Sequence, residues 1–316
     1  MASVASAARN VLLYLTANDD RSFAVDMLNF HHMRRHAPGV ARLEVVIVIS
    51  CVRPATAADQ RAIDWLIADC ADCPWLAVRA AIWKGNVGRD FSSAAVGLRA
   101  LAQELALDDR VMVRNRSGYG PFAPDWYRRY VDQLQRHPGT TLTGSTLCLR
   151  GHPKLASEAP WAHVQSYVYL SLWRYLRPLT GRFPGARCVE RTRVIVEGEI
   201  GLSRQFLLQG ARISCLHWPE LAVDAELASC SDLPREDFKN RDLGLPIRYK
   251  FKAYRRRLRD LGLHGRWLLR RLGAVHLAPP ALAPLHQFCS DYDAVAESSS
   301  RQESLEQVWS SAARQR

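Results

Sequence analysis

Short apolar runs alternate along the first half of the chain with longer stretches whose apolar residues recur every three or four positions. The short runs are rich in β-branched residues and end at polar turns, so they predict buried strands at 11–16, 43–50, 76–83 and 110–115. The longer stretches predict helices at 21–35, 56–70, from Phe91 to about 105, and 124–135. Alternating strands and helices with short connections are typical of a parallel sheet covered by helices, so we predict an α/β, Rossmann-type fold.

The alternation weakens after residue 140. Residues 141–147 and 211–218 predict strands, and the aromatic-rich stretch 161–180 favours a helix. Residues 193–210 predict a strand that continues as a helix ending near Gly210. The tail from about Ser290 is rich in Ser, Gln and Glu, which is typical of a mobile segment. These patterns predict a domain over 1–235 whose character changes near residue 147, followed by a C-terminal segment over 236–316.

Three polar segments follow predicted strands, at 16–20, 85–90 and 115–121, and the last two contain glycine. In open parallel sheets, ligands bind beyond the carboxyl ends of the strands. The segments therefore predict a nucleotide site in which Asn86 and Asp90 hydrogen-bond a base or ribose. The alternative is structural, since an aspartate at this position can cap the helix that follows.

Motifs in a fixed order extend this interpretation. They are NVGRDF (86–91), RNRSGYGPF (114–122), HVQSY (163–167) and EIGLSRQFLLQG (199–210). The series spans about 80–215 and resembles the rhamnan synthesis F family and related capsular or cell-wall glycosyltransferase-like proteins. The resemblance implies a GT-A-type fold, with a nucleotide-binding half at about 1–147 and an acceptor half at about 148–235. It also implies transfer of a hexosyl or deoxyhexosyl group from a nucleotide-sugar donor to a growing glycan.

The resemblance also assigns roles to residues. The implied donor-binding residues are Asn86, Gly88, Asp90, Asn115, Arg116 and Ser117. The implied acceptor-side residues are Gln165 and Ser166, with His163 beside them. Glu199 would be the base that takes the proton of the acceptor hydroxyl, because glutamate and aspartate usually do this in inverting transfer. His163 is the alternative base, and either side chain could instead have only a structural role.

Arg116 departs from the family pattern. Relatives often carry Asn-Asp-Ser at this strand end, whereas this chain has Asn-Arg-Ser, which removes the carboxylate best suited to Mg²⁺ or Mn²⁺. A guanidinium can also offset the charge of a departing diphosphate, and two arginines would repel a cation. We therefore expect no metal or other cofactor to be required, and activity that survives EDTA. The alternatives are that Arg114 and Arg116 meet only solvent or a carboxylate, or that the chain is an inactive relative.

The charge of the chain is concentrated in one segment. The formal net charge is +12, and residues 248–271 hold ten Lys or Arg against one Asp. The stretch 248–272 predicts a basic amphipathic helix, which suits an anionic membrane surface and a lipid-linked acceptor glycan. We expect a cytoplasmic protein, peripheral at the inner face of the membrane. A nucleic-acid-binding α/β protein that uses the same basic stretch is the rival interpretation.

Cysteine usage points to the same compartment. The eight cysteines are scattered, and the Cys70–Cys73 pair has no second pair or nearby histidine to complete a zinc site. Free thiols in a long chain favour a reducing cytoplasm. The chain starts without the pattern of a signal peptide, and no apolar run approaches the ~20 residues that span a bilayer.

Overall fold

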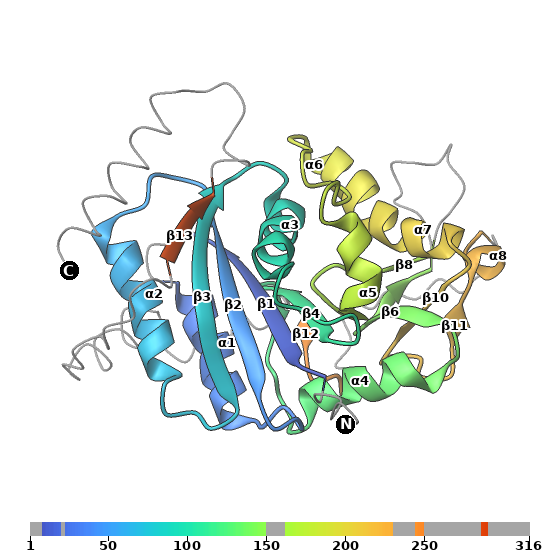
Figure 1. Cartoon of the computed structure of the whole chain (residues 1–316), viewed down its shortest axis with the longest axis horizontal. Helices are drawn as coiled ribbons and strands as arrows, with labels where there is room; N and C mark the ends of the chain where they lie inside the picture. The colour runs from blue at the N-terminus through green and yellow to red at the C-terminus, as the bar shows by residue number, and fades with distance from the viewer. Residues whose placement is uncertain (1–7, 20–22, 150–161, 230–243, 250–285, 290–316) are drawn as a thin grey trace, which may run out of the picture.

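The fold is built on one nine-stranded sheet. A computed structural model describes residues 8–19, 23–149, 162–229, 244–249 and 286–289 (Figure 1). The strands, in their order across the sheet, are β11 (Ala222–Val223), β10 (Arg212–Cys215), β6 (Thr140–Gly144), β9 (Val168–Leu172), β4 (Arg110–Asn115), β1 (Asn10–Ala17), β2 (Leu43–Cys51), β3 (Leu76–Gly85) and β13 (His286–Cys289). Only β9 and β11 run antiparallel to their neighbours, so the predicted mostly parallel sheet is confirmed.

Helices cover both faces of the sheet. On one face lie α1 (Ala24–Arg35), α2 (Ala57–Asp69) and α4 (Trp126–Arg136), and on the other lie α3 (Arg89–Leu101) and α7 (Gly201–Leu208). Strand β1 supplies Leu12 and Tyr14 to the first core and Leu13 and Leu15 to the second. All four side chains are at most 2% exposed, which explains why this strand reads as a continuous apolar run.

The aromatic-rich stretch 161–180 is not the helix that its composition favoured. It forms β8 (His163–Val164) and β9, and only afterwards the short α5 (Trp173–Leu176) and the 3₁₀ turn η2 (Arg177–Leu179). Strand β9 lies between β4 and β6, where its residues are buried by helices on both sides. A short apolar run buried in this way has no periodicity that separates strand from helix.

The predicted strand at the start of 193–210 is also wrong. The chain is helical from α6 (Arg191–Arg193) through the π-helical η3 (Val194–Ile200) into α7. Its β-branched residues suggested a strand, but η3 packs against α3 and β8, and packing overrides local propensity. The predicted end near Gly210 is confirmed, since α7 ends at Leu208 and Gly210 has a φ of +76°.

Two short strands after residue 235 pair with strands of the first 235 residues. Strand β12 (Arg248–Tyr249) pairs with β5 (Gly118–Tyr119), and β13 lies beside β3 at the edge of the main sheet (Figure 1). The first two residues of the predicted basic helix 248–272 are therefore a strand, and the rest of that helix falls outside the described residues. The remaining short elements are β7 (Leu147–Cys148), paired with β8, and α8 (Ala225–Ala228). No helix in the described ranges has the length and hydrophobicity to cross a membrane.

Candidate functional site

The motifs singled out in the sequence meet beyond the carboxyl end of β4. The side chain of Asn115 donates a hydrogen bond from Nδ2 to Asp90 Oδ2 at 2.7 Å, and its Oδ1 accepts from the backbone N–H of Ser117 at 2.8 Å. Asp90 does not cap α3, because the N-cap residue is Gly88 and no side chain caps this end. The structural alternative for Asp90 as a helix cap is therefore excluded.

Two backbone contacts join the later motifs to this pair. The N–H of Asn115 donates to the carbonyl oxygen of Tyr167 at 3.1 Å. The N–H of Ser166 donates to Glu199 Oε1 at 2.9 Å. RNRS thus contacts HVQSY, and HVQSY contacts the π-helical segment that carries Glu199.

Gly198 closes the ring of contacts. A Cβ atom at Gly198 would lie 2.7 Å from the ring of Phe91, in the first turn of α3. Because Gly198 has no side chain, η3 can pack closely against Phe91 of the NVGRDF motif. Glu199 follows Gly198 in the sequence and Asp90 precedes Phe91, so both lie beside this contact. Four segments spread over more than a hundred residues of sequence thereby share one location.

The turn before α3 is shaped by a second glycine. Gly88 has a φ of +67°, and its N–H donates to the carbonyl oxygen of Cys188 at 3.1 Å. A Cβ atom here would lie 1.9 Å from the carbonyl oxygen of Ala186. Arg89 also has a positive φ, of 49°, a backbone conformation that is disfavoured for a residue with a side chain. Asn86, at the start of the turn, is exposed.

The two arginines of RNRS do not face the same surroundings. Arg116 forms an ion pair with Asp19 beyond β1, donates to the carbonyl oxygen of Ala17 at 3.1 Å, and lies 3.9 Å from Asp26 Oδ2. Arg114 is fully buried and donates to the carbonyl oxygens of Gly118 and Gly120 at 2.6–3.2 Å. The argument that two guanidinium groups would repel a cation at this strand end is therefore wrong for Arg114, whose guanidinium is buried against backbone carbonyls. Arg116 meets carboxylates, as the structural alternative stated.

Burial and nearby positive charges have opposite effects on the pKa values of the Asp90 and Asp26 carboxyl groups. Burial raises the pKa of Asp90, while the Asn115 hydrogen bond and the charges of Lys84 and Arg116 oppose the rise. Burial also raises the pKa of Asp26 to about 6, against the opposing charge of Arg116. Asp26 is 0% exposed and accepts a hydrogen bond from the Tyr14 hydroxyl at 2.9 Å.

The raised pKa of Asp26 predicts a pH dependence of stability. Between pH 3.8 and about 6 the folded protein keeps a proton on Asp26 that the unfolded chain releases, so the free energy of unfolding should fall as the pH rises through this window. The change should be on the order of 3 kcal/mol at most. Urea unfolding at several pH values should show a shallower fall for Asp26→Asn than for wild type. The exposed Asp132→Asn should keep the wild-type slope, and an unchanged slope in Asp26→Asn would contradict the assignment.

The predicted acceptor-side residues are fixed by β8 and the turn after it. His163 is 4% exposed on β8, and the next residue, Val164, donates its N–H to Ser203 Oγ of α7 at 3.0 Å. Gln165 Oε1 accepts from Thr146 Oγ1 at 3.2 Å. The structure thus brings Ser166 into direct contact with Glu199, whereas Gln165 is bonded toward Thr146.

The carboxylates around Arg116 were not assigned any role from sequence. Asp19 lies in the polar segment after the first strand, so its position at the sheet edge was predicted without its pairing to Arg116. Asp26 lies in α1, where a carboxylate between apolar residues resembles an ordinary surface position and gives no signal. Within the described part of the chain, no three His, Cys, Asp or Glu side chains are grouped to hold a metal ion, and Cys70 and Cys73 are buried free thiols.

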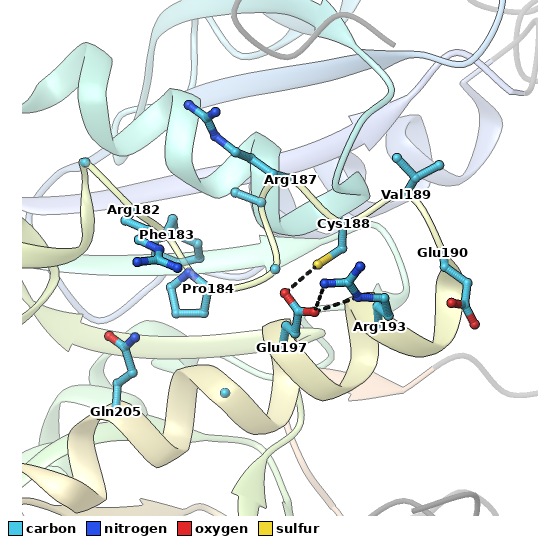
Figure 2. Close-up of a pocket in the computed structure, with 14 residues that line it drawn as sticks. Arg182, Phe183, Pro184, Arg187, Cys188, Val189, Glu190, Arg193, Glu197 and Gln205 are labelled. Carbon is cyan, nitrogen blue, oxygen red and sulfur yellow. Dashed lines mark hydrogen bonds and ion pairs between the residues drawn. The ribbon is translucent and has the colours of Figure 1, made fainter. Parts of the chain in front are cut away.

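A hollow of about 670 Å³ lies between the segment 181–190 and the helix formed by η3 and α7 (Figure 2). Glu197 projects into it and accepts hydrogen bonds from Cys188 Sγ at 3.0 Å and Arg193 Nε at 2.7 Å. The backbone of the same segment contacts the Gly88 turn through Cys188. The hollow and the convergent motifs therefore share a wall.

Comparison with known proteins gives matches only among solved structures. No family model and no curated protein matches the chain. The mannosyltransferase PcManGT from Pyrobaculum calidifontis, solved with GDP-Man and Mn²⁺, aligns at 12% identity with a TM-score of 0.43, over 66% of this chain and 55% of the mannosyltransferase. Mouse xyloside xylosyltransferase 1 aligns at 11% identity and 0.37, over 64% and 81%. The bifunctional glycosyltransferase WbbM aligns at 11% and 0.36, over 69% and 40%. The chain thus spans about half the length of the mannosyltransferase.

Proposed function

We propose that this protein is a glycosyltransferase that moves a hexosyl or deoxyhexosyl group from a nucleotide-sugar donor to a growing surface polysaccharide such as a capsule, an O-antigen or a cell-wall glycan. The observation that carries the proposal is the ring of contacts among NVGRDF, RNRS, HVQSY and the Glu199 segment. These contacts bring Glu199, the candidate base, close to the Gly88 turn, where the nucleotide would bind. Transfer of a group between two substrates requires both to be held at one site.

The donor would lie along the strand ends, with its base or ribose at Asn86 and Asp90 and its backbone close to Gly88. Asn115 and Ser117 would support Asp90, and the diphosphate would lie at Arg116. In this proposal the phosphate takes the place of Asp19 on the Arg116 guanidinium, whose planar fork suits phosphate oxygens. No metal ion is required in this scheme, because the guanidinium offsets the charge of the leaving group.

Glu199 would act as the base. One of its oxygens accepts from the Ser166 N–H, which leaves the other oxygen to take the proton of the acceptor hydroxyl. The hydroxyl oxygen then bonds to the anomeric carbon, and the nucleoside diphosphate departs with the electron pair of the broken bond. His163 is the alternative base, and Gln165 and Ser166 would flank the acceptor, a glycan or lipid-linked glycan held near an anionic membrane by residues 248–272.

The deciding experiment is nucleotide binding by the wild-type protein and by Asp90→Ala. UDP, GDP and dTDP should each be tested by calorimetry, and one should bind the wild type. We expect the affinity of Asp90→Ala for that nucleotide to fall at least about tenfold, because the variant loses a partly buried carboxyl group that would hydrogen-bond the nucleotide. The exposed Asp72→Ala is the matched control and should bind normally.

Two outcomes would count against the proposal. Unchanged nucleotide affinity in Asp90→Ala, with only a lower melting temperature, would make Asp90 a structural residue. Stabilisation by single-stranded or duplex DNA, and by none of the nucleotides, would favour the nucleic-acid-binding interpretation of the basic stretch.

A further inference from the structure

The hollow between the segment 181–190 and the helix that follows is separate from the proposed catalytic groups. Glu199 is directed toward Ser166, whereas Glu197, two residues earlier, faces the hollow (Figure 2). The helix therefore presents one glutamate to each side. The volume of about 670 Å³ is in the range of small-molecule sites.

At one end of the hollow, the charge of Glu197 is balanced by its own neighbours. Glu197 accepts from both Cys188 and Arg193, and these two hydrogen bonds lower the pKa of its carboxyl group. The burial of Cys188 and its bond to Glu197 raise the pKa of the thiol to about 11, so it remains a neutral donor near pH 7. The Arg193–Glu197 pair therefore presents little net charge to a ligand.

The other end offers two exposed polar side chains. The Arg182 guanidinium and the Gln205 side-chain amide make no hydrogen bond or ion pair with any residue in the described ranges, and both line the hollow near Pro184 (Figure 2). The charge of Arg182 also acts on Glu197 and lowers the pKa of its carboxyl group. An arginine fork pairs well with a carboxylate or a phosphate, and an amide can both donate to and accept from sugar hydroxyls. The ring of Pro184 supplies an apolar surface between them.

We propose that this hollow is a subsite for an acidic sugar, whose carboxylate or phosphate pairs with Arg182 while its hydroxyls bond to Gln205. The inference rests on the proposed function and specifies its acceptor: the glycan that receives the new sugar carries an anionic residue next to the sugar that reacts, because the hollow and Glu199 lie on different sides of the helix. The wall shared with the Gly88 turn, where the donor would bind, supports this, because Cys188 lines the hollow and its carbonyl oxygen accepts from the Gly88 N–H.

The test measures sugar binding by the full chain in the absence of nucleotide. The probes are methyl glucuronide and glucose 6-phosphate. Methyl glucoside is the neutral control, and inorganic phosphate is the control without a sugar. Binding of each is measured by calorimetry or ligand-observed NMR. We expect at least one acidic sugar to bind about tenfold or more tightly than methyl glucoside and inorganic phosphate. Its binding should weaken as salt is raised, since part of the attraction is between charges near the surface.

Matched variants identify the residue responsible. Arg182→Ala should remove the preference for acidic sugars and Arg182→Lys should keep part of it, whereas Arg177→Ala, an exposed arginine outside the hollow, should bind as wild type. Nucleoside diphosphate affinity should be unchanged in Arg182→Ala. Equal binding of methyl glucoside, an unaffected Arg182→Ala, or inorganic phosphate binding as tightly as the sugar phosphate would each overturn the inference. Absence of nucleotide binding by the wild type would instead refute the proposed function, whatever the sugars do.

Discussion

Glu199→Gln is expected to lower the turnover number about 100-fold or more while nucleoside diphosphate affinity stays at the wild-type value. Glutamine keeps the shape of the side chain, and its amide oxygen can still accept from the Ser166 N–H. What it loses is the oxygen that would take the proton of the acceptor hydroxyl. Steady-state transfer rates measured beside nucleotide titrations would separate this loss from a loss of binding.

The control for that experiment is Glu226→Gln, which changes an exposed glutamate on α8. It should leave turnover and binding unchanged. Near-normal turnover in Glu199→Gln together with a large loss in His163→Gln would move the role of base to His163. If both variants retain turnover, the assignment of proton transfer to this side of the sheet is wrong.

Gly88→Ala is expected to cost about 2–4 kcal/mol of unfolding free energy and to weaken nucleotide binding. The new Cβ would lie 1.9 Å from the carbonyl oxygen of Ala186, so either the 186–188 backbone or the Gly88 turn must move. The positive φ of Gly88 adds strain of its own. Urea unfolding and calorimetric titration with the preferred nucleotide would measure the two effects.

Gly210→Ala is the control that separates backbone strain at a positive φ from a steric clash of the new Cβ atom. Gly210 has a φ of +76°, but a Cβ there would meet no atom within 4 Å. This variant should lose only about 1 kcal/mol and should bind nucleotide normally. If Gly88→Ala behaves like Gly210→Ala, the contact between the Gly88 turn and the 186–188 backbone has no functional importance.

The first half of the fold could be predicted from sequence because its strands are short, rich in β-branched residues and alternate with stretches of helical periodicity. Val11–Leu15 and the apolar runs in β2 and β4 are buried and end at polar turns. The second half could not be predicted in the same way. Strand β9 and the helix through η3 owe their conformation to neighbours distant in sequence, and local preference pointed to the opposite element in each case.

The candidate site, too, could be predicted from sequence only in part. The order of the motifs predicted that Asp90 and Asn115 belong together, and the 2.7 Å hydrogen bond between their side chains agrees with this. The surroundings of Arg116 could not be foreseen, because Asp19 reaches it from the turn after the neighbouring strand β1 and Asp26 reaches it from α1. Pairings between side chains leave no trace in a single sequence unless the residues also follow a local pattern.

The position of β9 has a mechanical consequence. This strand comes from the predicted acceptor half, yet it hydrogen-bonds along its length to β4 and β6 of the predicted nucleotide half. Rotating one half against the other would break two ladders in the middle of the sheet, so the frame around the site resists hinge bending. Substrates of the proposed reaction would therefore enter and leave through movement of side chains and connecting segments, while the close approach of Gly198 to Phe91 holds η3, which carries Glu199, against α3.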